Sequence, residues 1–241
     1  RLRTVTGVQT CALPIFGGYY QLGSVEKVTL RGGASANVLD ASGFTRAATL
    51  EGMAGDDTLI GGSGNDSFAF VADSALGTDT ITGNGGKDTL DFTGTLAGVT
   101  VNLATLYPTA QVVNGNLSLK LKDLIENATG GSGNDSLTGN DLNNVLSGGP
   151  GNDSLAGGKG NETYVFDTDS AWGSETITEN TGDPGYDIID FSGTTTLAIN
   201  INLSILGSAQ VINANLTLTI NGQGFDEVIG GSLDDTIRGN S

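Results

Sequence analysis

Residues 130–165 read GGSGNDSLT, GNDLNNVLS, GGPGNDSLA and GGKGNETYV, which is one nine-residue pattern written four times without a gap. Each unit begins with glycine, and its eighth position holds a large apolar side chain: Leu137, Leu146, Leu155 and Tyr164. The sixth position carries Asp135, Asn144, Asp153 and Glu162. Self-similarity at a fixed short period is typical of repeat proteins, in which each unit packs on its neighbours.

The same pattern occurs elsewhere in the chain, interrupted by short insertions. GMAGDDTLI and GGSGNDSFA fill residues 52–69, and after FVAD the units SALGTDTIT and GNGGKDTLD fill residues 74–91. Further on, SAWGSETIT lies at 170–178, GDPGYDIID at 182–190 and GGSLDDTIR at 230–238. The sixth residues of these seven units are Asp57, Asp66, Asp79, Asp88, Glu175, Asp187 and Asp235.

A longer period of about one hundred residues contains the shorter one, because VNLATLYPTAQVVNGNLSLKL recurs as INLSILGSAQVINANLTLTI. We therefore predict one continuous β-solenoid over residues 16–241. It would hold two copies, 26–125 and 126–226, and the start of a third copy at 227–241. Because the sequence stops within a repeat, we expect it to be a fragment of a longer protein.

The composition points to cations as partners. The chain has 27 acidic and 10 basic side chains, a net charge of -17, which repels nucleic acid and anionic membrane surfaces. No stretch approaches about 18 consecutive apolar residues, so we expect no membrane insertion. The chain contains no histidine, which removes the usual general base and the commonest zinc ligand.

Residues 1–15 do not share the composition or the period of the remaining chain. The stretch VTGVQTCALPI at 5–15 resembles a translated sequencing adapter, so we interpret residues 1–15 as an artefactual leader to be excluded from fold arguments. A natural amino-terminal strand is the alternative. The only cysteine, Cys11, lies in this stretch; without it the chain has none, which suits an extracellular protein that does not depend on disulfides.

Nine residues are too few for a capped helix but suffice for a six-residue turn followed by a three-residue strand. Glycines in the turn allow the positive φ angles that would strain other residues. In the strand, the eighth residue points inward and its neighbours point outward. Two units then close one coil, so that residues eighteen apart in the sequence stack on one another.

Stacking places like charges close together. Strands lie about 4.8 Å apart, and two carboxylates at that distance repel by roughly 3 kcal/mol at an effective dielectric constant of about 20. One inward apolar side chain contributes only about 1.5 to 3 kcal/mol, against an ordering cost of about 1 to 2 kcal/mol per residue. We therefore expect a divalent cation between adjacent turns, and Ca²⁺ accepts the 6 to 8 oxygen ligands that two turns offer.

The pattern GGxGxDxUx, with U a large apolar residue, resembles the haemolysin-type RTX calcium-binding nonapeptide. The clean matches cover residues 52–69 and 130–165, and weaker ones cover 74–91, 182–190 and 230–238. The resemblance implies an all-β fold, a right-handed parallel β-roll, with Ca²⁺ held between turns by sixth-position carboxylates and glycine-loop carbonyls. It also implies export through a one-step (type I) secretion channel that reads a carboxy-terminal signal.

Carried onto this chain, the resemblance implies one site between Asp135 and Asp153 and two more that join Asp57 to Asp79 and Asp66 to Asp88. Turns that depart from the pattern, through Asn144, Glu162, Glu175 or Leu233, are expected to hold weak or empty sites. The residues so implied in calcium binding are Asp57, Asp66, Asp79, Asp88, Gly130, Ser132, Asp135, Asn144, Gly148, Pro150, Asp153, Glu162, Glu175, Asp187 and Asp235.

Residues 92–129 and 191–229 lack the motif but alternate apolar and polar side chains. We predict longer strands there that continue the solenoid without metal, with a packed antiparallel hairpin as the alternative. Four aromatic residues within or just after repeat units are expected to fill the core rather than to bind a ligand: Phe68, Phe70, Tyr164 and Phe166.

These observations favour a non-enzymatic calcium-binding module of a secreted, extracellular protein that folds on binding Ca²⁺ outside the cell. One alternative is a carboxy-terminal folding and secretion module of a hydrolase, lyase or epimerase whose catalytic domain lies elsewhere. Another is a repeat spacer of an adhesin or surface-layer protein. Any secretion machinery or cell-surface partner would act through regions outside this sequence.

Overall fold

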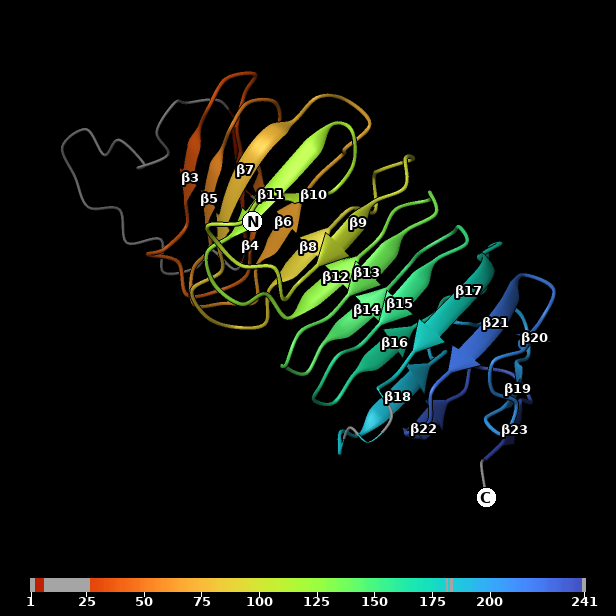
Figure 1. Cartoon of the computed structure of the whole chain (residues 1–241). Helices are drawn as coiled ribbons and strands as arrows, with labels where there is room; N and C mark the ends of the chain where they lie inside the picture. The colour runs from red at the N-terminus through yellow and green to blue at the C-terminus, as the bar shows by residue number, and fades with distance from the viewer. Residues whose placement is uncertain (1–2, 7–26, 181, 183, 240–241) are drawn as a thin grey trace. The chain divides into compact units, whose positions relative to one another are not determined.

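The computed structural model of the chain describes residues 3–6, 27–180, 182 and 184–239 (Figure 1). Within these residues every regular element is a strand. The chain divides into two compact units, Arg1–Asp91 with Thr105–Ile125, and Phe92–Ala104 with Glu126–Ser241. The expectation of one continuous solenoid over residues 16–241 stays a prediction.

In the first unit the chain alternates between two parallel sheets. Every pair of neighbouring strands within each sheet is parallel, apart from the antiparallel pair β10 and β11. One sheet contains, in spatial order, β1 (Arg3–Thr6), β2 (Val28–Arg31), β4 (Ala48–Glu51), β6 (Ser67–Ala69) and β8 (Thr89–Asp91). The other contains β3 (Val38–Asp40), β5 (Thr58–Ile60), β7 (Gly77–Thr82), β11 (Leu117–Leu121) and β10 (Gln111–Val112).

The second unit repeats this arrangement. One sheet contains β12 (Asn127–Thr129), β14 (Val145–Ser147), β16 (Thr163–Val165), β18 (Asp187–Asp190) and β22 (Phe225–Ile229). The other contains β9 (Thr100–Asn102), β13 (Ser136–Thr138), β15 (Ser154–Ala156), β17 (Gly173–Thr178), β21 (Leu216–Asn221) and β20 (Ala209–Val211), and a separate pair joins β19 (Asn200–Asn202) to β23 (Thr236–Arg238). Only the contact between β20 and β21 is antiparallel.

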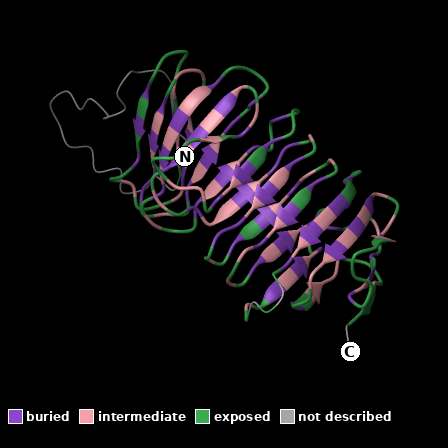
Figure 2. Cartoon of the chain, viewed as in Figure 1, coloured by how far each residue is buried: buried purple, intermediate pink, exposed green. Residues whose placement is uncertain are grey.

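The eighth residues of the repeat units form the core, as the pattern predicts. Leu137 pairs in register with Leu155, and Leu155 with Ile177, and all three side chains are fully buried. In the three-residue strands such as β13 the buried residue is flanked by partly exposed ones, and Figure 2 shows narrow buried bands on these strands. The four expected core aromatics, Phe68, Phe70, Tyr164 and Phe166, are also buried. The expected all-β parallel roll is therefore confirmed.

The motif-free segments contain both structures that the sequence left open. Strand β11 continues the stack by pairing parallel with β7, and it also forms an antiparallel hairpin with β10. Strand β21 pairs with β17 and β20 in the same way. A strand has two hydrogen-bonding edges, so one edge extends the roll while the other closes the hairpin.

Two further features concern the amino-terminal part. Strand β1 pairs in parallel with β2, but residues 7–15, including Cys11, lie outside the described residues. The structure also shows a unit that the sequence analysis missed: GGASANVLD at residues 32–40 has Asn37 at its sixth position and the fully buried Leu39 at its eighth. Asn37 lacks the carboxylate and Ser35 replaces the fourth glycine, so the unit was missed.

The described residues contain no helix that is long and apolar enough to cross a lipid bilayer.

Candidate metal centre

The sixth residues of the repeat units point into the roll beneath the turns. Ten of them have side chains exposed by 3% or less: Asp57, Asp66, Asp79, Asp88, Asp135, Asn144, Asp153, Glu162, Glu175 and Asp187. Asp235 is partly exposed. A buried carboxylate is costly unless it is hydrogen-bonded, paired with a cation or protonated. The roll therefore concentrates a large unfavourable charge inside itself.

One oxygen of each of these carboxylates, apart from that of Glu162, accepts an N–H from the previous coil. Asp153 Oδ1 accepts the Asp135 N–H at 2.8 Å, across eighteen residues of sequence. Where a four-residue insertion lengthens the coil, the same bond spans twenty-two residues: the Asp57 N–H donates to Asp79 Oδ1 at 2.9 Å. The Asp66 N–H likewise donates to Asp88 Oδ1 at 2.9 Å. The structure thus brings together the members of all three pairs that the sequence implied.

The longer side chain of Glu175 fills the same role as an aspartate. Its Oε2 accepts the Asp153 N–H at 3.2 Å, so Asp135, Asp153 and Glu175 form one continuous column. In a second column of this unit, Asp187 Oδ1 accepts the Glu162 N–H at 2.9 Å. At Glu175 the extra methylene therefore does not interrupt the contact between coils, whereas Glu162 takes part in its bond through the backbone N–H and not through its side chain.

The other oxygens of several carboxylates have no hydrogen-bond donor. Asp57 Oδ2, Asp79 Oδ2, Asp153 Oδ2 and Glu175 Oε1 are buried and accept no hydrogen bond. In contrast, Asp135 Oδ2 accepts the Gly131 N–H at 2.7 Å. Buried polar atoms are nearly always satisfied in native proteins, so four orphaned anionic oxygens indicate that a cation belongs beside them.

Backbone carbonyls also lie close to carboxylates at two of the turns. A Cβ atom built onto Gly130 would lie 2.2 Å from Asp135 Oδ2 and 2.3 Å from the Gly148 carbonyl oxygen. At Gly61 the corresponding distances are 2.5 Å to Asp66 Oδ2 and 2.7 Å to the Gly83 carbonyl oxygen. Only glycine fits at these positions, and its small size lets a carboxylate and a carbonyl of the next coil approach each other. Such hard oxygen donors are the ligands that Ca²⁺ prefers.

Four other residues of the implied set lie outside these carboxylate pairs. Ser132 and Pro150 lie at exposed turn positions, and the Ser132 N–H donates to the Thr95 carbonyl at 2.9 Å. Asp235 Oδ1 accepts the Ile199 N–H at 2.9 Å, which places it at the equivalent point of the last described coil. Asn144 is buried, and its carboxamide bonds to protein groups on both sides.

The buried carboxyl groups hold protons more tightly than exposed ones. Burial is the main cause, and it raises the pKa of Asp79 to about 7, helped by the charges of Asp57 and Asp56. Burial also raises the pKa of Asp153, and it raises that of Glu175 with a further contribution from the Asp153 charge. Each column therefore resists full ionisation unless positive charge is supplied.

The structure adds one residue that the sequence analysis missed. Carboxylate oxygens of Glu162, Glu179 and Asp187 lie within 4.8 Å of one another, and all three residues are buried. The Tyr164 hydroxyl donates to Glu179 and lies 3.3 Å from the Thr178 carbonyl oxygen. Glu179 follows β17 directly, where the first copy has Gly83, so a comparison of the two copies could have revealed it.

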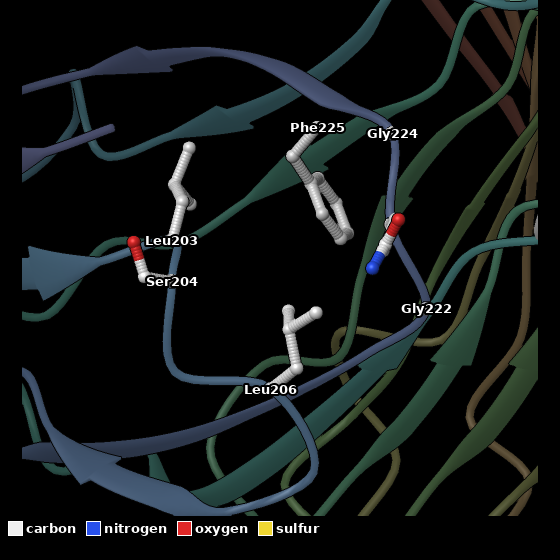
Figure 3. Close-up of a pocket in the computed structure, with 7 residues that line it drawn as sticks. Leu203, Ser204, Leu206, Gly222, Gly224 and Phe225 are labelled. Carbon is white, nitrogen blue, oxygen red and sulfur yellow. The ribbon is translucent and has the colours of Figure 1, made fainter. Parts of the chain in front are cut away.

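The second unit also contains a pocket of about 250 Å³, lined by Leu203, Ser204, Leu206, Gly222, Gln223, Gly224 and Phe225. Figure 3 shows the side chains of Leu206 and Phe225 pointing toward each other across it. None of these residues carries a charge, and none is a sixth-position residue. The pocket nevertheless lies beside the acidic cluster, because Phe225 pairs with Asp187 and a Cβ built onto Gly224 would lie 3.9 Å from Asp187 Oδ2.

Comparison with known families agrees with this geometry. Residues 79–204, just over half of the chain, match the family described as peptidase M10 serralysin C terminal, and the chain belongs to this family. Residues 42–70 match the RTX calcium-binding nonapeptide repeat, described as four copies. Both families are typical of type I secreted proteins. No curated protein matches the chain.

Proposed function

We propose that this member of the serralysin C-terminal family is a non-enzymatic module that folds by binding Ca²⁺ outside the cell. The observation that carries the proposal is the set of buried carboxylate oxygens without hydrogen-bond donors, at Asp57, Asp79, Asp153 and Glu175. The RTX repeat match supports Ca²⁺ as the cation.

The proposed ligands come from pairs of successive coils. Asp57 with Asp79, Asp66 with Asp88, and the column Asp135, Asp153 and Glu175 would supply the carboxylates. Carbonyls such as that of Gly148 would supply neutral oxygens. A bound divalent cation would offset the repulsion between stacked carboxylates, while the carboxylates hold successive coils in register by accepting backbone N–H groups of the neighbouring coil.

The concentration of the ion then explains where the chain folds. Extracellular calcium modules typically bind at about 10⁻⁴ to 10⁻³ M, far above cytosolic levels of free Ca²⁺. Because the binding free energy contributes to folding, the chain would stay unfolded before export and would fold outside. This order suits a secretion channel that passes unfolded chains.

The test is a calcium titration followed by circular dichroism, with Mg²⁺ in parallel. We expect a cooperative gain of sheet at millimolar Ca²⁺ and little response to Mg²⁺, which demands a stricter octahedron and keeps its waters. Asp153→Asn should raise the Ca²⁺ concentration required. Asp141→Asn makes the same charge change at an exposed side chain, paired at 2.9 Å with Lys159, and should leave the titration unchanged. Full sheet content in metal-stripped buffer at neutral pH would contradict the proposal.

A specific observation favours a peptidase as the host of this module. The matched family is described as the carboxy-terminal part of serralysin peptidases. In that case the module would support folding and export of a catalytic domain elsewhere in the protein. In the test, residues 27–239 replace the repeat region of a secreted serralysin, and that protein's catalytic domain and carboxy-terminal secretion signal are kept. The fused peptidase should then fold in a calcium-dependent way. Failure of the fused peptidase to refold at millimolar Ca²⁺ would argue against this host.

A further inference from the structure

One sixth-position residue differs chemically from those around it. Asn144 is exposed by only 1%, and it occupies the column that continues to Glu162 and Asp187. The sixth-position residues of the neighbouring units are acids, whereas the carboxamide of Asn144 carries no charge that a cation could offset. The question is what holds this coil to the previous one.

Every polar atom of the Asn144 side chain has a protein partner. Its Oδ1 accepts the Asn140 N–H at 2.7 Å. Its Nδ2 donates to the Glu126 carbonyl at 2.7 Å and to Asn140 Oδ1 at 3.1 Å. These partners also fix the orientation of the amide, because a carbonyl oxygen can only accept a hydrogen bond and an N–H can only donate one.

The bond to Glu126 crosses the same interval as the carboxylate bonds but runs in the opposite direction. Both Asn144 to Glu126 and Asp153 to Asp135 span eighteen residues of sequence. Asp153 Oδ1 accepts an N–H from the previous coil, which leaves Oδ2 buried without a donor. Asn144 instead donates to the previous coil, so no anionic oxygen is left for a cation to satisfy.

The backbone around Asn144 nevertheless has the shape of a calcium-binding turn. A Cβ built onto Gly139 would lie 2.2 Å from Asn144 Oδ1 and 2.0 Å from the Gly157 carbonyl oxygen. The matching distances at Gly130 are 2.2 Å to Asp135 Oδ2 and 2.3 Å to the Gly148 carbonyl oxygen. The two turns therefore match in these distances, and they differ in the group that faces the glycine, which is a carboxamide in one turn and a carboxylate in the other.

We propose that the Asn144 carboxamide replaces an ion with hydrogen bonds, so that the coil step from Glu126 to Asn144 closes without Ca²⁺. This inference rests on the proposed function, because it states at which coil the proposed calcium sites are interrupted. The ions of the second unit are then confined to the column of Asp135, Asp153 and Glu175 and to the acids beyond Asn144. The step at Asn144 is a part of the roll whose stability does not depend on calcium concentration.

The test counts Ca²⁺ bound to the folded full chain, by equilibrium dialysis and elemental analysis at saturating Ca²⁺. Asn144→Asp converts the carboxamide into a carboxylate on an unchanged backbone, so we expect the variant to bind one ion more than the wild type. Asn144→Ala removes the hydrogen bonds without adding a ligand. It should unfold at a lower temperature in saturating Ca²⁺ but bind as many ions as the wild type.

The outcomes separate this inference from the proposed function. If the Ala variant loses an ion, or if the Asp variant gains none, then Asn144 is an ordinary member of the calcium column and the inference is wrong. Asp153→Asn is the reference, since it should lose calcium in either case. If the wild type binds no Ca²⁺ at all and Asp153→Asn changes nothing, the proposed function itself has failed.

Discussion

Removing calcium should make the stability of the roll depend on pH in an unusual direction. The pKa of Asp79 lies near 7 in the folded chain and near 3.8 for an ordinary aspartate, chiefly because the side chain is buried. Between these values the folded state binds more protons than the unfolded state. The metal-free fold therefore becomes more stable as the pH falls from about 7 to about 4, and this gain is lost again as the pH rises.

The size of the effect follows from the same two pKa values. The interval between 3.8 and about 7 corresponds to roughly 4 kcal/mol for Asp79 alone. Burial raises the pKa of Asp57, Asp66 and Asp135 as well, and each of these acts in the same direction. A domain is stabilised by only about 5 to 15 kcal/mol, so such a gain is a large fraction of the stability of a fold.

The assay is urea unfolding followed by circular dichroism in metal-stripped buffers between about pH 5 and about pH 8. Saturating Ca²⁺ should reverse the slope, because the ion binds the deprotonated carboxylates and protons compete with it. Asp79→Asn cannot ionise, so it should make the metal-free profile shallower, while the exposed Asp141→Asn should leave its slope unchanged. Metal-free stability that increases from pH 5 to pH 8, or a slope unchanged in Asp79→Asn, would refute the reasoning.

Two further substitutions test the turn and the core. Gly130→Ala should weaken calcium binding in a calorimetric titration, because its methyl group would lie 2.2 Å from Asp135 Oδ2; Gly43→Ala, with no atom within 4 Å of the added carbon, should bind as the wild type does. Equal affinities would contradict the account of the turn. Leu155→Ala should lower the free energy of unfolding in saturating Ca²⁺ by about 2 to 5 kcal/mol, because the side chain is fully buried in the central stack. Val112→Ala, at a side chain exposed by 67%, should change it little, and a similar cost at both sites would exclude a core made of eighth-position residues.

Much of the carboxylate arrangement could be predicted from spacing alone. A strict nine-residue period places residues eighteen apart on top of one another, so the pairing of Asp135 with Asp153 follows from counting. The four-residue insertion before Asp79 lengthens the coil without changing the partner, because Asp57 and Asp79 remain neighbours. The apolar eighth residue decides which face is inward, and a shift of one residue would expose every core side chain.

Other features could not be read from the repeat. Glu179 lies outside the sixth position, and it joins Glu162 and Asp187 only because the coils bring residues from three different turns together. The hairpins of β10 with β11 and β20 with β21 were one of two alternatives, since alternation of apolar and polar residues does not distinguish parallel from antiparallel neighbours.

The amino-acid sequence by itself determined the roll, its core and the stacking of its acids, because these depend on period and on residue type. Only the tertiary structure decided which oxygen of each carboxylate is satisfied and which is left for a cation. It also decided that Asn144 is satisfied completely by protein groups. The physical reason is that a hydrogen bond between coils depends on the direction of each donor and acceptor, and that direction is set only when the turns are stacked.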